Sequence, residues 1–466
     1  QKAAESETKP MKFFFYNLLL PVAFVLYLPA FVAKLLRRGG YRNHFGERFG
    51  RFSRKQRKRL TRLGRPVWVH AVSVGEVVAA LTFIRRWKER TPHLDFVLST
   101  TTTTGHATAE KKKPAGVELI YMPIDFPWAV RKALRLVDPA MLVIFEVEFW
   151  PNLIRLTHAR GVPLVLANGR LSDRSAEGYA RHRWFFGDLF ARFSALCVQT
   201  EDDAERMKRV TGPDAPVQVC NTMKFDQVPD AEQPDRTELL DQTFGKGRRI
   251  VFTAGSTHAG EEHLVARAYA RLKQEFPALR LVLVPRHHER TAEVEKVLTE
   301  LGLSYRLRVP PPNAATPEPP VDVLLINTTG ELMDFYALSD VVFVGKSLAG
   351  NRGGHNIIEP AIFGDAILYG AAMDNFRFVA RIFRDHSAAW EIREDADFEP
   401  ALRTLLAEPK QRRELGKRAR EVVEKYRGAI DRTLETIEPL LKNGTTESGD
   451  PDTPATHPGK AKEPTE

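Results

Sequence analysis

The chain has 466 residues, of which 43% are hydrophobic and 27% are charged. This composition is typical of a globular protein with room for about three domains, and it excludes wholesale disorder. The two cysteines, Cys197 and Cys220, exclude a disulfide framework and a cysteine-based zinc site. The net charge is 69 − 59 = +10, yet residues 34–65 alone hold thirteen Lys and Arg against one acid. This local concentration argues against a nucleic-acid-binding face spread over a domain.

An apolar run over residues 13–33 precedes the basic residues. Twenty-one helical residues would span about 31 Å, which is enough to cross the hydrocarbon core of a bilayer. The basic flank is typical of the cytoplasmic side of a membrane helix. We therefore expect a membrane anchor helix over 11–36 and a basic juxtamembrane segment over 37–65. A buried core helix is the main alternative.

Short apolar segments alternate with helical patterns in the first half of the remaining chain. The expected strands are 67–72, 95–99, 118–122, 141–146, 163–168 and 195–199. Apolar strands separated by helices indicate a parallel sheet that is covered on both faces. The pattern predicts an N-terminal Rossmann-like domain over 66–225, followed by a polar linker over 226–247.

The same alternation restarts after the linker. The expected strands are 250–255, 280–285, 322–327, 341–345 and 366–369. A second Rossmann-like domain is predicted over 248–442, and the Gly-, Pro- and Thr-rich residues 443–466 are expected to be a disordered tail. The fold class is thus α/β, with two doubly wound domains facing each other across a cleft, where such folds bind ligands.

Several common cofactor motifs are missing. No G-x-G-x-x-G follows a predicted strand and no G-x-x-x-x-G-K-[ST] exists, so the dinucleotide and P-loop interpretations lose their main support. The His and Cys residues lack the spacing of a metal site. We expect no metal and no cofactor.

The segment HAVSVGEV follows the first predicted strand. Ser73 and Glu76 have the spacing of a capping box, in which each side chain bonds a free backbone N–H of the other residue. Glu76 would also project from the carboxyl end of a strand, where a carboxylate can act as general base for an acceptor hydroxyl. The residues alone leave the cap and the base as open alternatives.

Three segments of the second domain also follow predicted strands: GSTHAGEE at 255–262, NTTGEL at 327–332 and GGHNIIEP at 353–360. Gly255 and Ser256 have the character of an anion site at a helix start, where Ser256 can cap. Thr328 and Glu331 have capping-box spacing. Glu359 is placed to accept the hydroxyls of a ribose. Each segment alone is typical of a helix cap, but their recurrence at strand ends favours a nucleotide pocket.

Charged residues stand at the ends of two other predicted strands and at the end of the first predicted domain. Arg286, in PRHH, has a guanidinium suited to a phosphate, although a solvated loop arginine is equally consistent. Glu146 and Glu148, in FEVEFWPN, are two carboxylates at the end of an apolar strand, where they need a partner or a use. Lys224, in NTMKFD, is a candidate partner. An ordinary salt bridge is the alternative.

These motifs, together with the segments ANGRLSDRS and YRNHFGERFG, occur in the order and at the intervals of a known family. The chain resembles the 3-deoxy-D-manno-octulosonic acid (Kdo) transferases, glycosyltransferase family 30. The resemblance covers residues 11–442. It implies a GT-B fold and an inverting mechanism, with CMP-Kdo as donor and a lipid A precursor, lipid IVA, as acceptor in lipopolysaccharide core biosynthesis. It also implies an inner-membrane location with the catalytic domains on the cytoplasmic side.

The resemblance also assigns roles to residues. Glu76 would be the catalytic base, and Glu146 and Lys224 would support the transition state. The expected CMP-binding residues are Pro285, Arg286, Thr329, Gly330, Glu331, Asn356, Ile357, Ile358 and Glu359, with Gly255 and Ser256 from the anion-site pattern. No metal ligand is implied, and no nucleic acid is expected as a partner.

Two other functions remain open from the sequence. Another GT-B glycosyltransferase would use a UDP-sugar on a lipid acceptor, and a preference for CMP over UDP would separate it from a Kdo transferase. A membrane-tethered nucleotide-binding protein without catalysis would keep Glu76 but turn over no sugar donor.

Overall fold

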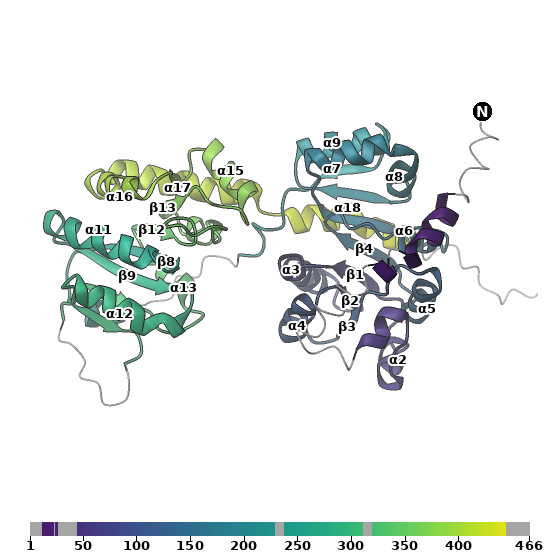
Figure 1. The fold of residues 1–466 in the computed structure, drawn as a ribbon, viewed down its shortest axis with the longest axis horizontal. Coiled ribbons are helices and arrows are strands. Elements are labelled where there is room, and N and C mark those ends of the chain that lie inside the picture. The colour runs from purple at the N-terminus through teal and green to yellow at the C-terminus, as the bar shows by residue number, and fades with distance from the viewer. Residues whose placement is uncertain (1–11, 23, 27–43, 229–236, 311–318, 444–466) are drawn as a thin grey trace, which may run out of the picture. The chain divides into compact units, whose positions relative to one another are not determined.

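The structure is a computed structural model that describes residues 12–22, 24–26, 44–228, 237–310 and 319–443. The described residues form two compact units (Figure 1). Unit 1 holds those up to Gln227 and those from Gly428 onward, and unit 2 runs from Val228 to Arg427. Each unit carries one seven-stranded parallel sheet with helices on both faces. The prediction of two doubly wound α/β domains is confirmed.

The sheet of unit 1 has the order β3-β2-β1-β4-β5-β6-β7. Its strands are β1 Val67–Ala71, β2 Phe96–Thr100, β3 Val117–Tyr121, β4 Met141–Phe145, β5 Leu164–Gly169, β6 Ala195–Val198 and β7 Val217–Val219. Side chains alternate between the two faces of a strand. Val67 and Val69 therefore pack into one core, and Trp68 packs into the core on the other face. Burial on both faces explains why the strands are nearly all apolar.

The connections of unit 1 are mostly helical. Its helices are α2 Arg54–Leu60, α3 Val74–Arg90, α4 Thr103–Lys112, α5 Pro127–Val137, α6 Pro151–His158, α7 Asp173–Arg181, α8 Arg183–Phe190, α9 Glu201–Thr211 and α18 Ala429–Asn443, with the 3₁₀ turn η1 Phe45–Phe49. The carboxyl ends of all seven strands lie at one edge of the sheet, and the loops at that edge carry the candidate residues.

The sheet of unit 2 has the order β10-β11-β9-β8-β12-β13-β14. Its strands are β8 Ile250–Thr257, β9 Leu279–Pro285, β10 Tyr305–Leu307, β11 Val323–Leu325, β12 Val341–Val344, β13 Ala366–Gly370 and β14 Trp390–Ile392. Its helices are α10 Thr237–Phe244, α11 Glu261–Glu275, α12 Thr291–Glu300, α13 Leu332–Tyr336, α14 Ile358–Ala361, α15 Arg377–Asp385, α16 Phe398–Ala407 and α17 Pro409–Tyr426, with 3₁₀ turns η2 His288–Arg290 and η3 Asp395–Asp397.

Three predicted boundaries are wrong. The linker over 226–247 contains α10, because Leu240 and Phe244 bury their side chains against the sheet of unit 2. The C-terminal domain predicted over 248–442 does not include the last helix, α18. Ile430 and Leu434 of α18 pack into the core of unit 1. The described part of the basic segment, 44–65, belongs to unit 1 rather than forming a separate element. The tail from residue 444 lies outside the described residues.

The N-terminal helix covers 12–22 and 24–26 and packs on unit 1. Phe13 is buried in the core, and the Tyr16 hydroxyl donates to Asp125 Oδ2 at 2.9 Å. The remaining part of the anchor predicted over 11–36 lies mostly outside the described residues. Among the described residues, no helix combines the length and apolar character that crossing a bilayer requires.

Candidate active site

Glu76 lies in the first turn of α3, directly after β1. Its Oε2 accepts the Val72 N–H at 2.9 Å and its Oε1 accepts the Ser73 N–H at 3.2 Å. The Glu76 N–H donates to Ser73 Oγ at 3.3 Å, so the predicted capping box is confirmed. A carboxylate has about four acceptor positions, so two backbone bonds leave capacity to accept a further proton. The cap therefore holds Glu76 in place and leaves lone pairs of its carboxylate available for a further hydrogen bond.

Glu146 follows β4 in the left-handed region, with φ of 55°. Its N–H donates to Ala167 O at 3.0 Å, which fixes this unusual backbone. Burial and the negative charge of Glu76 raise the pKa of Glu146, and the positive charge of Lys224 opposes that rise. Burial lowers the pKa of Lys224, against the effect of Glu146. The structure thus brings together the three residues that the sequence assigned to catalysis.

Glu148 joins the same group of charges. Burial, together with the negative charges of Glu76 and Glu146, raises the pKa of Glu148 to about 7. Burial, and to a smaller extent the negative charge of Glu148, raises the pKa of Tyr179. The carboxyl edge of the unit 1 sheet therefore holds three carboxyl groups and one amine that interact electrostatically, an arrangement that can accept and hold protons near neutral pH.

Gly255 and Ser256 lie inside β8, not at the start of a helix. A Cβ on Gly255 would lie 2.1 Å from the Tyr336 hydroxyl, so close packing against Tyr336 explains this glycine. Ser256 has φ of 55°, and the pairing of β8 with β9 shifts register there. The predicted cap at Ser256 is wrong, because α11 begins only at Glu261 after Gly260.

The second predicted capping box is also wrong. The Thr328 hydroxyl donates to the Glu331 carboxylate instead of accepting a backbone N–H, and α13 begins only at Leu332. Glu331 also accepts from Arg308 Nη2 at 3.0 Å. Its carboxylate is thus held within unit 2 by side chains. The adjoining predicted residues Thr329 and Gly330 are exposed.

Asn356 and Glu359 form a small network after β12. Asn356 Oδ1 accepts the Ile358 N–H at 3.2 Å, and its Nδ2 donates to Glu359 Oε1 at 3.3 Å. Burial raises the pKa of Glu359, while the positive charge of Arg286 opposes that shift. Ile357 and Ile358 are fully buried, so they can offer a ligand only their backbone. Pro285, the last residue of β9, is also buried.

Glu261 organises the loops around this network and was not predicted. It is fully buried, and its carboxylate accepts hydrogen bonds from the backbone N–H groups of His258, Lys346, Ser347 and Leu348 at 2.8–3.0 Å. A carboxylate with four backbone donors fixes the loops after β8 and β12 relative to each other. Glu261 is part of the GSTHAGEE segment. The local pattern does not show from which distant backbone amides its carboxylate accepts hydrogen bonds.

The same loops bring cationic and imidazole groups together. His258 Nε2 lies 3.1 Å from His355 Nε2, and their rings stack at 19°. Burial, the charge of Lys346 and that of nearby arginines lower the pKa of His258 to about 4. Burial and the charge of Arg286 lower the pKa of His355 to about 3. Neither Arg286 nor Lys346 has a carboxylate ion-pair partner among the described residues. This cationic cluster is suited to bind an anion.

No group of His, Cys, Asp and Glu in the described part of the chain could hold a metal ion. The titratable groups described above include carboxylates, amines and imidazoles. They are concentrated at the carboxyl edge of each sheet, where doubly wound folds bind their ligands.

The two parallel α/β units have the architecture of GT-B glycosyltransferases. A glycosyltransferase from Rickettsia africae shares this fold, with a TM-score of 0.53 at 10% identity, over 81% of this chain and 99% of that chain. The sequence is more specific. A sequence model described as 3-deoxy-D-manno-octulosonic-acid transferase (kdotransferase) matches residues 43–227.

Two curated relatives carry the same name. The 3-deoxy-D-manno-octulosonic acid transferase of Haemophilus influenzae is 31% identical over 92% of this chain and 99% of its own length. That of Bordetella pertussis is 33% identical over 84% of this chain and 91% of its own length. The chain belongs to the Kdo transferase family and is a glycosyltransferase.

Proposed function

We propose that this enzyme transfers Kdo from CMP-Kdo to lipid IVA with inversion at the anomeric carbon. The observation that carries the proposal is the cationic cluster of unit 2, in which the charges of Arg286 and Lys346 both act on His355 and that of Arg286 also acts on Glu359. Neither cation forms a salt bridge among the described residues. A CMP donor would supply the missing anion through its phosphate and a ribose for Glu359 to bind. Such a cluster favours a phosphorylated donor over a neutral one.

The reaction has one bond-forming and one bond-breaking event. The acceptor hydroxyl oxygen attacks the anomeric carbon of Kdo, and its proton passes to Glu76 as general base. The bond from the anomeric carbon to the phosphate oxygen breaks, and CMP leaves with the electron pair. Arg286 and the loop amides of unit 2 stabilise the leaving phosphate. Glu146 and Lys224 stabilise the positive charge and the carboxylate of the reacting sugar.

We further propose that no metal takes part. The leaving group carries a single phosphate, whose charge Arg286 and Lys346 can balance. This proposal is independent of the choice of acceptor and is tested separately below.

The membrane location is also proposed. The N-terminal helix exposes apolar side chains, Leu18 at 57%, Leu19 at 62% and Leu26 at 77% among them. Those side chains, together with the remainder of the predicted anchor over 11–36, would enter the inner membrane from its cytoplasmic side. The basic residues over 37–65 would add about 1 kcal/mol each of attraction to anionic headgroups.

One assay tests the proposal. The purified protein is incubated with CMP-Kdo, generated in situ, and lipid IVA, and the products are read by mass spectrometry. Product masses increased by Kdo are expected. Transfer from a UDP-sugar but not from CMP-Kdo would favour another GT-B glycosyltransferase, and CMP binding without turnover of any sugar donor would favour a nucleotide-binding protein.

A further inference from the structure

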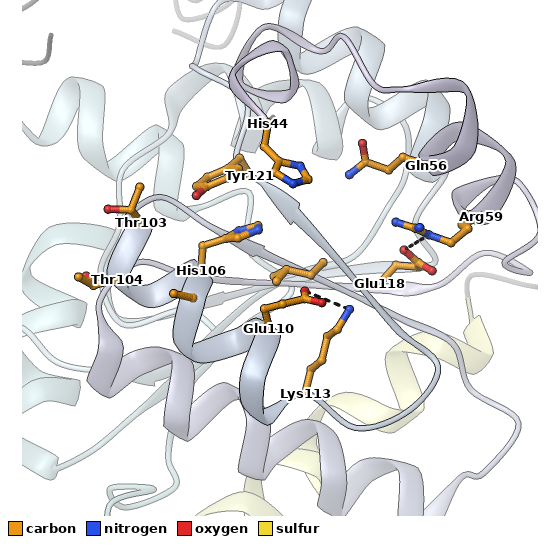
Figure 2. A pocket seen from close by; sticks show the side chains of 12 residues that line it. His44, Gln56, Arg59, Thr103, Thr104, His106, Glu110, Lys113, Glu118 and Tyr121 are labelled. Carbon is orange, nitrogen blue, oxygen red and sulfur yellow. Dashed lines mark hydrogen bonds and ion pairs between the residues drawn. The ribbon is translucent and has the colours of Figure 1, made fainter. Parts of the chain in front are cut away.

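Unit 1 contains a hollow lined by charged, polar and aromatic side chains, none of which belongs to the carboxylates around Glu76. Its volume is about 960 Å³, and it is bounded by α4, the edge strand β3 and the segment from His44 to Arg59 (Figure 2). A smaller hollow of about 290 Å³ shares His44, Gln56 and Arg59 with it. Both hollows lie entirely within unit 1.

The larger hollow offers donors and acceptors side by side. Arg59 Nε donates to Glu118 Oε2 at 2.9 Å, and Lys113 Nζ lies 3.3 Å from Glu110 Oε2 (Figure 2). Each pair is close to neutral in sum, yet it presents a cation and a carboxylate to the same space. A saccharide hydroxyl can donate one hydrogen bond and accept another. A neutral sugar can therefore hydrogen-bond to both the cation and the carboxylate of such a pair.

One wall of the larger hollow is rigid and aromatic. The rings of His106 and Tyr121 stack at 3.9 Å and 5° (Figure 2). Arg48 lies 4.3 Å from the centre of the Tyr121 ring and donates through Nη2 to Thr101 O at 2.8 Å. The wall is thus fixed by contacts on both sides before any ligand arrives.

Gln56 is the feature that points most directly to a ligand. The residue is only 5% exposed, and among the described residues its side-chain amide has no hydrogen-bond partner. Figure 2 shows the amide directed toward the hollow. The amide atoms of Gln56 open onto the hollow and are not among the buried polar atoms that lack a partner, so they are available to hydrogen-bond a ligand that enters it.

The smaller hollow differs in charge from the larger one. Arg51, Lys55 and Arg59 line it, and Glu47, the carboxylate on its wall, is 3% exposed and accepts the Tyr121 N–H. Arg59 is already paired with Glu118, so Arg51 and Lys55 supply the positive charge for a phosphate in this hollow of about 290 Å³. A polar hollow that adjoins a cationic one matches a sugar that bears a phosphate group.

The hollow is connected to the proposed base. Thr102, which caps α4, donates through its hydroxyl to Val72 O at 2.7 Å, and the Val72 N–H donates to Glu76. The strands that lead into these two loops, β1 and β2, are adjacent and parallel. A ligand held against the start of α4 therefore adjoins the loop between β1 and α3, and Glu76 lies in the first turn of α3.

We propose that these two hollows bind the phosphorylated sugar headgroup of the acceptor, with the sugar against Gln56 and α4 and its phosphate among Arg51, Lys55 and Arg59. The proposal rests on the proposed function for the identity of the acceptor. The pocket would orient the headgroup, while its acyl chains remain outside.

Direct binding tests the pocket without relying on turnover. A phosphorylated glucosamine disaccharide without acyl chains is titrated into the full chain by calorimetry, beside its unphosphorylated form and inorganic phosphate. Gln56→Met should weaken both disaccharides about tenfold, and Lys55→Met should weaken only the phosphorylated one, by about tenfold. Lys58→Met is the matched control on α2, because Lys58 is exposed and lines neither hollow, and it should change affinity less than twofold.

Three results would overturn the proposal. The first is no binding of the phosphorylated disaccharide to the wild-type chain. The second is an equal loss in Lys55→Met and Lys58→Met, which indicates general surface attraction. The third is binding of phosphatidylglycerol vesicles or inorganic phosphate that depends on Lys55 while the disaccharide does not bind. Lys55 is exposed, so its variant does not endanger the fold.

The transfer assay separates this inference from the proposed function. If the wild-type chain transfers Kdo and the Gln56 and Lys55 variants keep its acceptor KM, the pocket assignment fails alone. If no variant and no wild-type chain transfers Kdo, the proposed function fails, and the calorimetric result still decides whether the pocket binds a phosphorylated sugar.

Discussion

The candidate sites of the two units share a scaffold and differ in charge. Each lies at the carboxyl edge of a seven-stranded parallel sheet, and each includes a non-glycine residue in the left-handed region, Glu146 in unit 1 and Ser256 in unit 2. Such residues store about 1–3 kcal/mol of strain, which tends to persist where function requires it. Unit 1 gathers carboxylates around Glu76, whereas unit 2 gathers Arg286, Lys346 and neutral histidines.

This comparison supports the proposal that the two units carry different tasks. Burial and neighbouring negative charge raise the pKa of Glu146 and Glu148, and we propose that Glu76 beside them takes the proton of the acceptor hydroxyl. A cluster of cations that form no salt bridge among the described residues suits a bound phosphate. The following experiments test the assignment of proton transfer to unit 1 and of donor binding to unit 2.

The largest effect is expected for Glu76→Gln. Glutamine retains the size of the side chain and can still bond the backbone amides of the capping box, but it cannot act as a base. Turnover should fall by about 10²–10⁴ while the melting temperature and CMP affinity stay near wild type. Glu89→Gln, at an exposed position of the same helix, is the control for the charge change. Retained activity would reduce Glu76 to a helix cap.

A smaller loss is expected when unit 2 loses a charged contact to the donor. Arg286→Ala and Glu359→Ala should each weaken CMP binding about ten- to a hundredfold, because each removes a charged hydrogen-bond partner. Calorimetric titration of CMP measures this, with Arg267→Ala, an exposed arginine of α11, as control. Unchanged affinity in both variants would exclude these residues from the donor site.

Acid should weaken unit 2 through its histidines. The pKa values of His258 and His355 are lowered to about 4 and about 3, below the usual 6.5. Below pH 6.5 the unfolded unit therefore binds more protons than the folded unit, and stability falls as the pH decreases toward 4.

Hydrogen exchange, corrected for intrinsic rates, can measure this effect in peptides from β8. From pH 6.5 to 5, protection should fall by up to about two hundredfold, and the double variant His258→Gln, His355→Gln should lose less. An equal decline in the wild type and the double variant would show that these histidines do not control the acid response.

The smallest effect is expected from metal removal. With preformed CMP-Kdo, EDTA should leave the rate unchanged, because on the proposed function Arg286 and Lys346 would balance the charge of the single donor phosphate without a metal. A large drop that Mg²⁺ restores would reveal a metal site.

The long buried strands and the capping box of Ser73 and Glu76 could be predicted, because burial on both faces and cap spacing are local patterns. The strands β7, β10 and β14 were missed, since they are three residues long and partly exposed. The return of α18 to unit 1 could not be seen in a local pattern.

Within the candidate site, Glu76, Glu146 and Lys224 interact electrostatically, and the catalytic roles that the resemblance implies for them stay predictions. The caps assigned to Ser256 and Thr328 failed, because β8 continues through Thr257 and because the Thr328 hydroxyl bonds a side chain instead of an amide. His258 and His355 were missed as a pair, since residues 97 positions apart show no spacing that links them.

The most direct test of the division of roles makes the same change in both units. Lys224→Met and Lys346→Met each remove one amine, and CMP is titrated into each variant by calorimetry. CMP affinity should fall about tenfold or more for Lys346→Met and stay within twofold of wild type for Lys224→Met, whose loss should appear in turnover. An equal fall in CMP affinity for both variants, or a fall only for Lys224→Met, would contradict the assignment of donor binding to unit 2.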